Sequence, residues 1–82
     1  MSYFVYILEC SDNSLYTGIT TNINKRIDEH NNSPKGAKYT KARRPVKLVY
    51  QEASKDRSTA SKREYAIKKL TKTKKLELIA KK

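Results

Sequence analysis

The chain has 82 residues, of which 19 are lysine or arginine and 8 are aspartate or glutamate, so its formal net charge at pH 7 is +11. That length suits one domain and leaves no room for a second, and the surplus of positive charge favours a polyanionic partner. The single cysteine excludes an internal disulfide, and no apolar stretch approaches the roughly 20 residues of a membrane span, so we expect a cytoplasmic protein without membrane association.

The amino-terminal residues predict a β-hairpin. Residues 3–10 (YFVYILEC) carry apolar side chains on both alternating faces, which is typical of a central strand covered on both sides. The SDNS cluster at 11–14 predicts a turn, and 15–20 (LYTGIT) predict the returning strand. A two- or four-residue loop would place Tyr6 and Tyr16 on opposite faces of the sheet. A three-residue loop or a bulge would place them on the same face, and we expect this second arrangement.

A helix is predicted directly after the hairpin. Thr21 or Asn22 can cap it, and residues 23–31 (INKRIDEHN) carry two isoleucines on one side. At 100° per residue, Arg26 and His30 lie beside that apolar stripe. One interpretation is a partly buried histidine beside an arginine whose aliphatic stem covers apolar surface. The other is that both side chains belong to a catalytic site.

The rest of the chain predicts one more strand and two more helices. The segments are a loop with at most one helical turn at 31–45, a strand at 46–52, a helix capped by Asp56 or Ser58 and ending near Leu70, and a short helix from about Thr73 to Ala80. The order β-β-α-β-α-α predicts an α+β fold, with a small three-stranded, largely antiparallel sheet flanked by helices, in one domain over 1–82.

One carboxylate, Glu64, lies among basic residues at the edge of the apolar face of the penultimate helix. A surface ion pair with Lys68, one turn further on, is one interpretation. The other starts from the needs of phosphodiester hydrolysis. That reaction requires a hard cation held by oxygen ligands, a positive group that meets developing negative charge, and a proton acceptor for water. Glu64, Arg26 and a tyrosine or histidine could supply these parts.

Most of the positive charge lies in the second half of the chain. Residues 42–82 hold fourteen of the basic and four of the acidic residues, whereas residues 1–41 are close to neutral. This half either contacts a phosphate backbone or forms a solvated face. No segment resembles a base-reading helix or a zinc finger, so we expect little sequence specificity. RNA remains open as a partner beside DNA.

Taken in order, these residues resemble the GIY-YIG nuclease superfamily. FVYIL stands where the Gly-Ile-Tyr strand would be, and LYTG stands where Tyr-Ile-Gly would be. The motif arginine falls at Arg26 in NKRIDEH and the helical glutamate at Glu64 in KREYAIKKL. GAKYTKARRPVKLVY resembles the segment that leads into the third strand of compact members. The chain departs from the pattern at Phe4, Thr17 and Ile19, and it lacks the asparagine that many members carry after the glutamate.

The resemblance implies a DNA endonuclease that uses one divalent cation, Mg²⁺ or Mn²⁺, on branched or damaged DNA with low sequence specificity. It implies a catalytic set of Tyr6, Tyr16, Arg26, His30 and Glu64, with Glu64 as the metal ligand. It implies a substrate-binding set of Gly18, Lys38, Tyr39, Thr40, Arg43 and Arg44. The departures leave a second interpretation open, a nucleic-acid-binding module of the same fold with weak or no activity. A protein partner could supply specificity, and the oligomeric state is not predicted.

Overall fold

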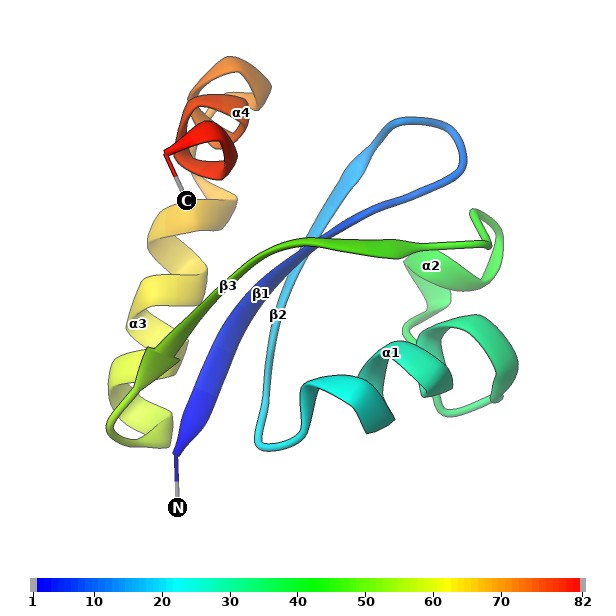
Figure 1. Cartoon of the computed structure of the whole chain (residues 1–82), viewed down its shortest axis with the longest axis horizontal. Helices are drawn as coiled ribbons and strands as arrows, with labels where there is room; N and C mark the ends of the chain where they lie inside the picture. Colours follow the sequence, from blue (N-terminus) through cyan, green and yellow to red (C-terminus); the bar gives the residue numbers. More distant parts are fainter. Residues whose placement is uncertain (1, 82) are drawn as a thin grey trace.

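The computed structural model of the chain describes residues 2–81. Its elements in chain order are β1 (Tyr3–Glu9), β2 (Leu15–Thr20), α1 (Ile23–Asn32), α2 (Lys38–Lys41), β3 (Lys47–Ser54), α3 (Arg57–Lys68) and α4 (Lys72–Ala80) (Figure 1). The predicted α+β fold is confirmed, and α2 is the helical turn allowed in the predicted loop. Among the described residues, none of the helices is long and apolar enough to span a lipid bilayer.

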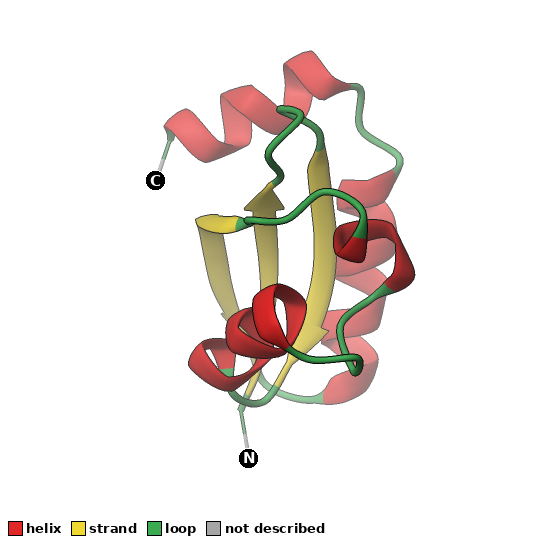
Figure 2. Cartoon of the chain, turned by 90° about the vertical axis from the view of Figure 1, so that its right-hand side faces the viewer, coloured by secondary structure: helices red, strands yellow, loops and turns green. Residues whose placement is uncertain are grey.

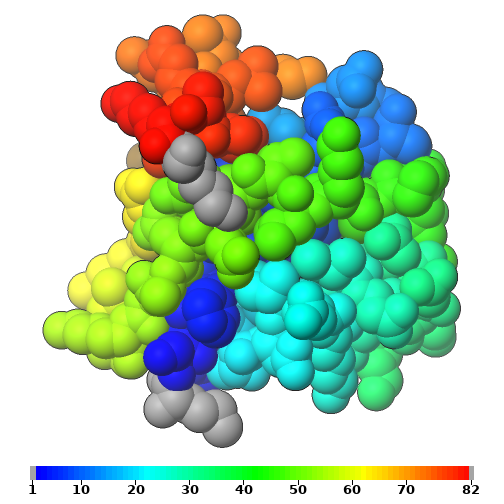
Figure 3. All heavy atoms as spheres, in the orientation of Figure 1, coloured from blue at the N-terminus to red at the C-terminus, as the bar shows by residue number. Residues whose placement is uncertain are grey.

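The three strands form one antiparallel sheet in the order β2-β1-β3, so β1 is the central strand, as its two apolar faces predicted. Helices lie on both sides of this sheet. In Figure 2, α1 and α2 lie in front of the strands, and α3 and α4 lie behind them. The space-filling view shows the same division, with α1 and the following segment (cyan to green) on one side and α3 and α4 (yellow to red) on the other (Figure 3).

The β1–β2 hairpin places the two tyrosines on one face. Leu8 is paired with Tyr16 and Tyr6 with Gly18, so Tyr6 and Tyr16 point to the same side of the sheet. The turn consists of residues 11–13, closed by a 2.9 Å hydrogen bond from the Cys10 amide to the Ser14 carbonyl. Asn13 adopts the left-handed conformation, with φ 68°, that a three-residue hairpin loop requires. The predicted three-residue loop is therefore confirmed.

A bulge in β3 resets its register against β1. Ile7 is paired with Tyr50 but Leu8 with Leu48, so Val49 is the extra residue. The shift places Leu48 on the same face as Leu8, although Tyr50 faces the opposite side with Ile7. The sequence pattern of β3 did not predict this bulge.

Each face of the sheet has its own hydrophobic core. The core beneath α3 and α4 is formed by Val5, Ile7, Tyr50, Ala60 and Ile67. The core on the α1 face is formed by Tyr6, Leu8, Cys10 and Val46. The second core is smaller and contains the candidate catalytic Tyr6, so the sheet face covered by α1 holds the site.

Candidate active site

Tyr6 lies at the centre of the site and is almost fully buried, with 2% of its surface exposed. Its hydroxyl is 2.9 Å from Nε2 of His30 on α1. Gly18, the cross-strand partner of Tyr6, lies directly beneath the ring: a Cβ atom there would come within 2.4 Å of the Tyr6 hydroxyl oxygen. The sequence prediction gave Gly18 a substrate-binding role. In the structure Gly18 is buried, and the absence of a side chain there leaves space for the Tyr6 ring.

His30 is fully buried and belongs to a directed chain of hydrogen bonds. Its Nδ1 is 2.8 Å from the Thr40 hydroxyl, which donates its only proton to the Ala37 carbonyl at 2.9 Å. The hydroxyl oxygen therefore accepts a hydrogen bond from Nδ1–H, so Nδ1 carries the proton and Nε2 accepts a hydrogen bond from the Tyr6 hydroxyl. Thr40 was predicted to bind substrate. Its side chain is fully buried and holds the His30 tautomer instead.

The environment of His30 keeps its ring neutral. Burial, together with the positive charges of Arg26 and Arg44, lowers the pKa of His30 from 6.5 to about 4, and the charge of Glu29 partly opposes this shift. Because the pKa lies near 4, the imidazole is a proton acceptor throughout the neutral range.

Tyr6 is held in its protonated form. Burial raises its pKa to about 12, although the hydrogen bond from Arg26 favours the phenolate. The negative charge of Glu64 also raises the pKa of Tyr6. Of the charges that act on the Tyr6 hydroxyl, the one from α3 has the smallest effect.

A pH dependence of stability follows from the neutral histidine. The unfolded chain takes up a proton at His30 near pH 6.5, whereas the folded chain does so only near pH 4. The contribution of neutral His30 to the free energy of unfolding should therefore be fully present above pH 6.5. It should be lost as the pH falls from 6.5 to 4, which lowers the free energy of unfolding by about 3 kcal/mol. Urea unfolding at several pH values measures this slope. His30 is the only histidine, so the His30→Gln protein should lose most of the slope; an unchanged slope would contradict a neutral buried ring.

Arg26 lies beside Tyr6 on α1 and remains charged. Its Nη1 is 3.0 Å from a carboxylate oxygen of Glu29 and 3.0 Å from the Lys35 carbonyl. Burial alone would lower the pKa of Arg26, but the contacts with Glu29 and with Tyr6 raise it. The sequence analysis did not single out Glu29. Its spacing of three residues from Arg26, one helical turn, was the available signal.

Tyr16 connects the histidine to two predicted substrate-binding residues. Its ring packs edge-on against His30, with centroids 5.3 Å apart, and stacks on Tyr39 at 5.9 Å. The Arg43 guanidinium lies 3.9 Å from the centre of the Tyr39 ring and forms a 3.0 Å ion pair with Asp12. Tyr39 therefore stacks on Tyr16 and Arg43 stacks on Tyr39, as successive members of one aromatic and cationic stack.

The other two predicted substrate-binding residues lie outside this stack. Arg44 donates to the carbonyls of His30 and Ser33 and so ties the loop before β3 to the end of α1. Its charge still lowers the pKa of His30. Lys38 is exposed at the start of α2.

Glu64 reaches the site from α3. Its carboxylate forms a 3.4 Å ion pair with Lys68, and the Lys68 ammonium lies 6.0 Å from the centre of the Tyr16 ring. Glu64 therefore has the predicted ion pair with Lys68, and through Lys68 it is linked to the ring of Tyr16. Its side chain is 23% exposed, so one oxygen can still face solvent.

The site suits a cation that needs few protein ligands. Within residues 2–81 no cluster of three or more histidine, cysteine, aspartate or glutamate side chains could enclose a metal ion. Mg²⁺ and similar ions keep several waters and bind through one or two carboxylates together with substrate phosphate. Glu64 alone fits that mode, and a zinc-type cage is not available in this part of the chain.

The order of these residues along the chain corresponds to a known catalytic domain. A family model described as the GIY-YIG catalytic domain matches residues 2–77. The chain belongs to the GIY-YIG family. The resemblance seen in the sequence is confirmed, and membership in GIY-YIG places the chain in a nuclease superfamily that acts on nucleic acids and is generally dependent on divalent metals.

Relatives of this GIY-YIG chain cover nearly all of it. A UPF0213 protein of Desulfotalea psychrophila is 64% identical over 78 residues, which span 95% of this chain and 71% of that protein. A UPF0213 protein of Staphylococcus aureus is 59% identical, over 95% of this chain and 94% of that protein.

Two solved structures share the fold. The solution NMR structure of a UPF0213 protein from Bacillus halodurans is 46% identical, with a TM-score of 0.64, and the match covers 100% of this chain and 86% of that one. The solution NMR structure of a protein from E. faecalis is 47% identical, with a TM-score of 0.63, over 95% of this chain and 83% of that one.

Proposed function

We propose that this GIY-YIG protein is a divalent-metal-dependent DNA endonuclease that acts on branched or damaged DNA, in repair or processing, with low sequence specificity. The observation that carries the proposal is a convergence. Tyr6 from β1, Tyr16 from β2 and Arg26 and His30 from α1 meet in one cluster, and Glu64 from α3 influences the same tyrosine electrostatically. These are the parts that phosphodiester hydrolysis requires.

Each side chain has a distinct task in this proposal. Arg26 binds the scissile phosphate and stabilises the negative charge that develops on it. Glu64 would hold the divalent ion, which would supply Lewis-acid stabilisation of the phosphate and a more acidic water. Tyr16, packed against His30, orients the attacking water beside the Tyr6 hydroxyl.

The proton moves along the chain from Tyr6 to His30. A free phenolate is unfavourable in the resting site, because burial raises the pKa of Tyr6 and lowers the pKa of His30. We therefore favour a concerted step. Water gives a proton to the Tyr6 oxygen while the Tyr6 proton passes to Nε2 of His30. The water oxygen bonds to phosphorus, and the departing strand oxygen takes a proton from solvent.

The exposed basic residues supply affinity without sequence reading. On α3, on α4 and at the turn between them these include Lys62, Lys68, Lys69, Lys72 and Lys74, all exposed. Contacts between lysine and phosphate depend on charge rather than base identity, and they weaken steeply with salt. This distribution supports binding of many DNA sequences and leaves specificity to DNA shape or to a partner protein.

One observation favours the second candidate function, a nucleic-acid-binding module with weak activity. Glu64 is paired with Lys68, and Arg26 is paired with Glu29. Both charges are partly neutralised, so substrate and metal must displace these partners before catalysis begins.

Metal removal tests the proposed function. The wild-type protein should nick supercoiled plasmid and cut branched or single-stranded oligonucleotides with Mg²⁺ or Mn²⁺. EDTA should stop the reaction and added Mg²⁺ should restore it, because the phosphate and water need the cation. A Glu64→Gln protein purified in parallel controls for contaminating nuclease. Equal traces of cleavage in both preparations would show contamination and would leave the binding module as the function.

A further inference from the structure

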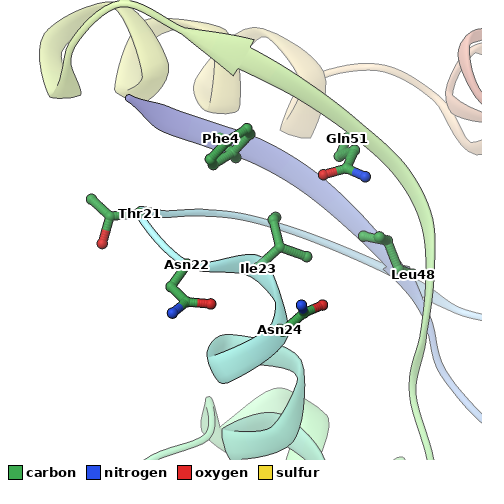
Figure 4. A pocket seen from close by; sticks show the side chains of 7 residues that line it. All are labelled: Phe4, Thr21, Asn22, Ile23, Asn24, Leu48 and Gln51. Atoms are coloured by element: carbon green, nitrogen blue, oxygen red, sulfur yellow. The ribbon is translucent and has the colours of Figure 1, made fainter. Parts of the chain in front are cut away.

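A hollow of about 370 Å³ lies between the start of α1 and the sheet, on the face that carries Tyr6 (Figure 4). Its volume falls within the range of roughly 300–1,000 Å³ that is usual for small-molecule sites. The residues that line it are Phe4, Thr21, Asn22, Ile23, Asn24, Leu48 and Gln51. Thr21, Asn22, Asn24 and Gln51 are exposed, so the hollow opens to solvent.

The hollow is next to the candidate active site but separate from it. Gln51 on β3 is the cross-strand partner of Tyr6, so both point to the α1 face. The bulge at Val49 brings Leu48 to that face as well. The Tyr6 ring leans the other way, over Gly18 on β2. The hollow therefore lies on the β3 side of Tyr6, and the catalytic cluster lies on its β2 side.

Its lining combines an apolar floor with an amide rim. Phe4, Ile23 and Leu48 project into the hollow from the strands and from α1, as Figure 4 shows. The Asn22 side chain is already used, since its oxygen accepts from the Lys25 amide at the start of α1. Asn24 and Gln51 are exposed, so each side-chain amide can offer a donor and an acceptor to a ligand.

The charge of the lining selects the kind of ligand. None of the described side chains that line the hollow is charged, although the chain as a whole carries +11. A phosphate would find no cation there. A neutral, flat group that is attached to a polyanion fits both the uncharged lining and the positive net charge. The basic surface of the protein would bind the polyanion, and the hollow would receive its neutral group.

We propose that this hollow binds an unpaired nucleobase of a nucleic-acid strand, close to the phosphate that is cleaved. Asparagine and glutamine amides pair with the donor and acceptor edges of bases, and an aromatic ring such as Phe4 stacks on a base face. The proposal rests on the proposed function, since it identifies the substrate of the same site. It adds that strands with an unpaired base near the scissile bond are bound in preference to continuous duplex.

Binding to the hollow can be measured without cleavage. The Glu64→Gln protein in EDTA is titrated with short DNA and RNA oligonucleotides that differ at one base, and ¹⁵N NMR follows the side-chain amides of Asn24 and Gln51. These amide signals should shift, and affinity should differ among the four bases by about fivefold or more. Whichever set of oligonucleotides, DNA or RNA, binds more tightly identifies the kind of nucleic acid that the hollow receives. Shifts confined to the lysines of α3 and α4 would overturn the proposal.

Substitutions in the rim provide the second test. Asn24→Leu and Gln51→Leu should reduce the differences in affinity among the bases to below about twofold, because both are exposed and only the amide is lost. Asn32→Leu is the matched control: Asn32 is an exposed amide at the other end of α1, bonded to Asp28, and its loss should leave base preference unchanged. Unchanged preference in both rim variants would overturn the proposal.

Phe4→Leu tests the stacking contact. It keeps an apolar side chain in the floor but removes the ring, and affinity for an oligonucleotide with an unpaired 2-aminopurine should fall by about tenfold. The ¹⁵N spectrum reports whether the variant is folded, and equal affinity in a folded variant would contradict stacking. The two proposals fail separately: base binding without any cleavage would refute the nuclease alone, and cleavage without base binding would refute the hollow alone.

Discussion

Replacing Glu64 with glutamine should lower DNA cleavage by about a thousandfold or more and leave fold and DNA affinity nearly unchanged. Glutamine has the same shape but lacks the negative charge that holds a divalent cation, and metal stabilisation of a phosphoryl group is worth several kcal/mol. Loss of the partly exposed ion pair with Lys68 should cost the fold less than about 1 kcal/mol. Single-turnover cleavage at several Mg²⁺ concentrations, with thermal unfolding alongside, measures both effects.

Glu77→Gln is the matched control for this change. Glu77 lies on α4 and pairs with Lys74 at 3.7 Å, so the substitution removes the same charge and a similar lysine contact away from the catalytic cluster. Its cleavage rate should equal that of the wild type. If both variants cleave at the wild-type rate, Glu64 is a surface partner for Lys68 and the cation is held elsewhere.

Local sequence pattern predicted the elements that carry the site. Alternation along β1 identified a central strand with two covered faces, and the polar cluster before β2 identified the turn, although the length of the loop had to be chosen between two alternatives. Both rest on contacts between residues close in sequence. Such contacts follow from the period of two in a strand and from the φ that a turn residue adopts, and they do not depend on the remainder of the fold.

The contacts that set the chemistry could not be predicted in the same way. Tyr6 and His30 are 24 residues apart, and the bond that fixes the His30 tautomer comes from Thr40 in the next segment. Only packing of α1 against the sheet brings them together. The resemblance to the family named Thr40 and Gly18 as substrate contacts. Both are buried, however, and their shape and hydrogen bonds serve Tyr6 and His30 instead.

The bulge at Val49 shows the same limit on β3. Without it, Leu48 would lie on the α3 face, and the hollow beside α1 would lose part of its floor. Simple alternation cannot locate an extra residue in a strand. Beyond a bulge every residue faces the opposite side of the sheet from the one that alternation alone predicts. The position of the hollow relative to Tyr6 therefore required the structure.

Replacing Arg26 with alanine should lower the rate of cleavage by about a hundredfold to a thousandfold while affinity for DNA changes by less than about twofold. The guanidinium is one of 19 basic side chains, and fourteen of these lie in residues 42–82, so binding depends mainly on other charges. In the proposed mechanism, however, the Arg26 guanidinium acts on the Tyr6 hydroxyl and stabilises the transition state, and loss of one such donor costs that much in rate. Single-turnover rates with protein in excess, and fluorescence anisotropy without metal, separate the two quantities.

The neighbours of Arg26 supply the controls and a second readout. Lys25→Ala removes an exposed charge from the next position on α1 and should change neither rate nor fold. Arg26→Lys keeps the charge but loses the planar fork, so its rate should lie between those of the wild type and the alanine variant.

Loss of Arg26 also removes a positive charge that lowers the pKa of His30, while the negative charge of Glu29 still raises that pKa. The acid limb of any remaining activity should therefore move to higher pH. A large loss of affinity at an unchanged rate would instead make Arg26 one more contact to the DNA backbone.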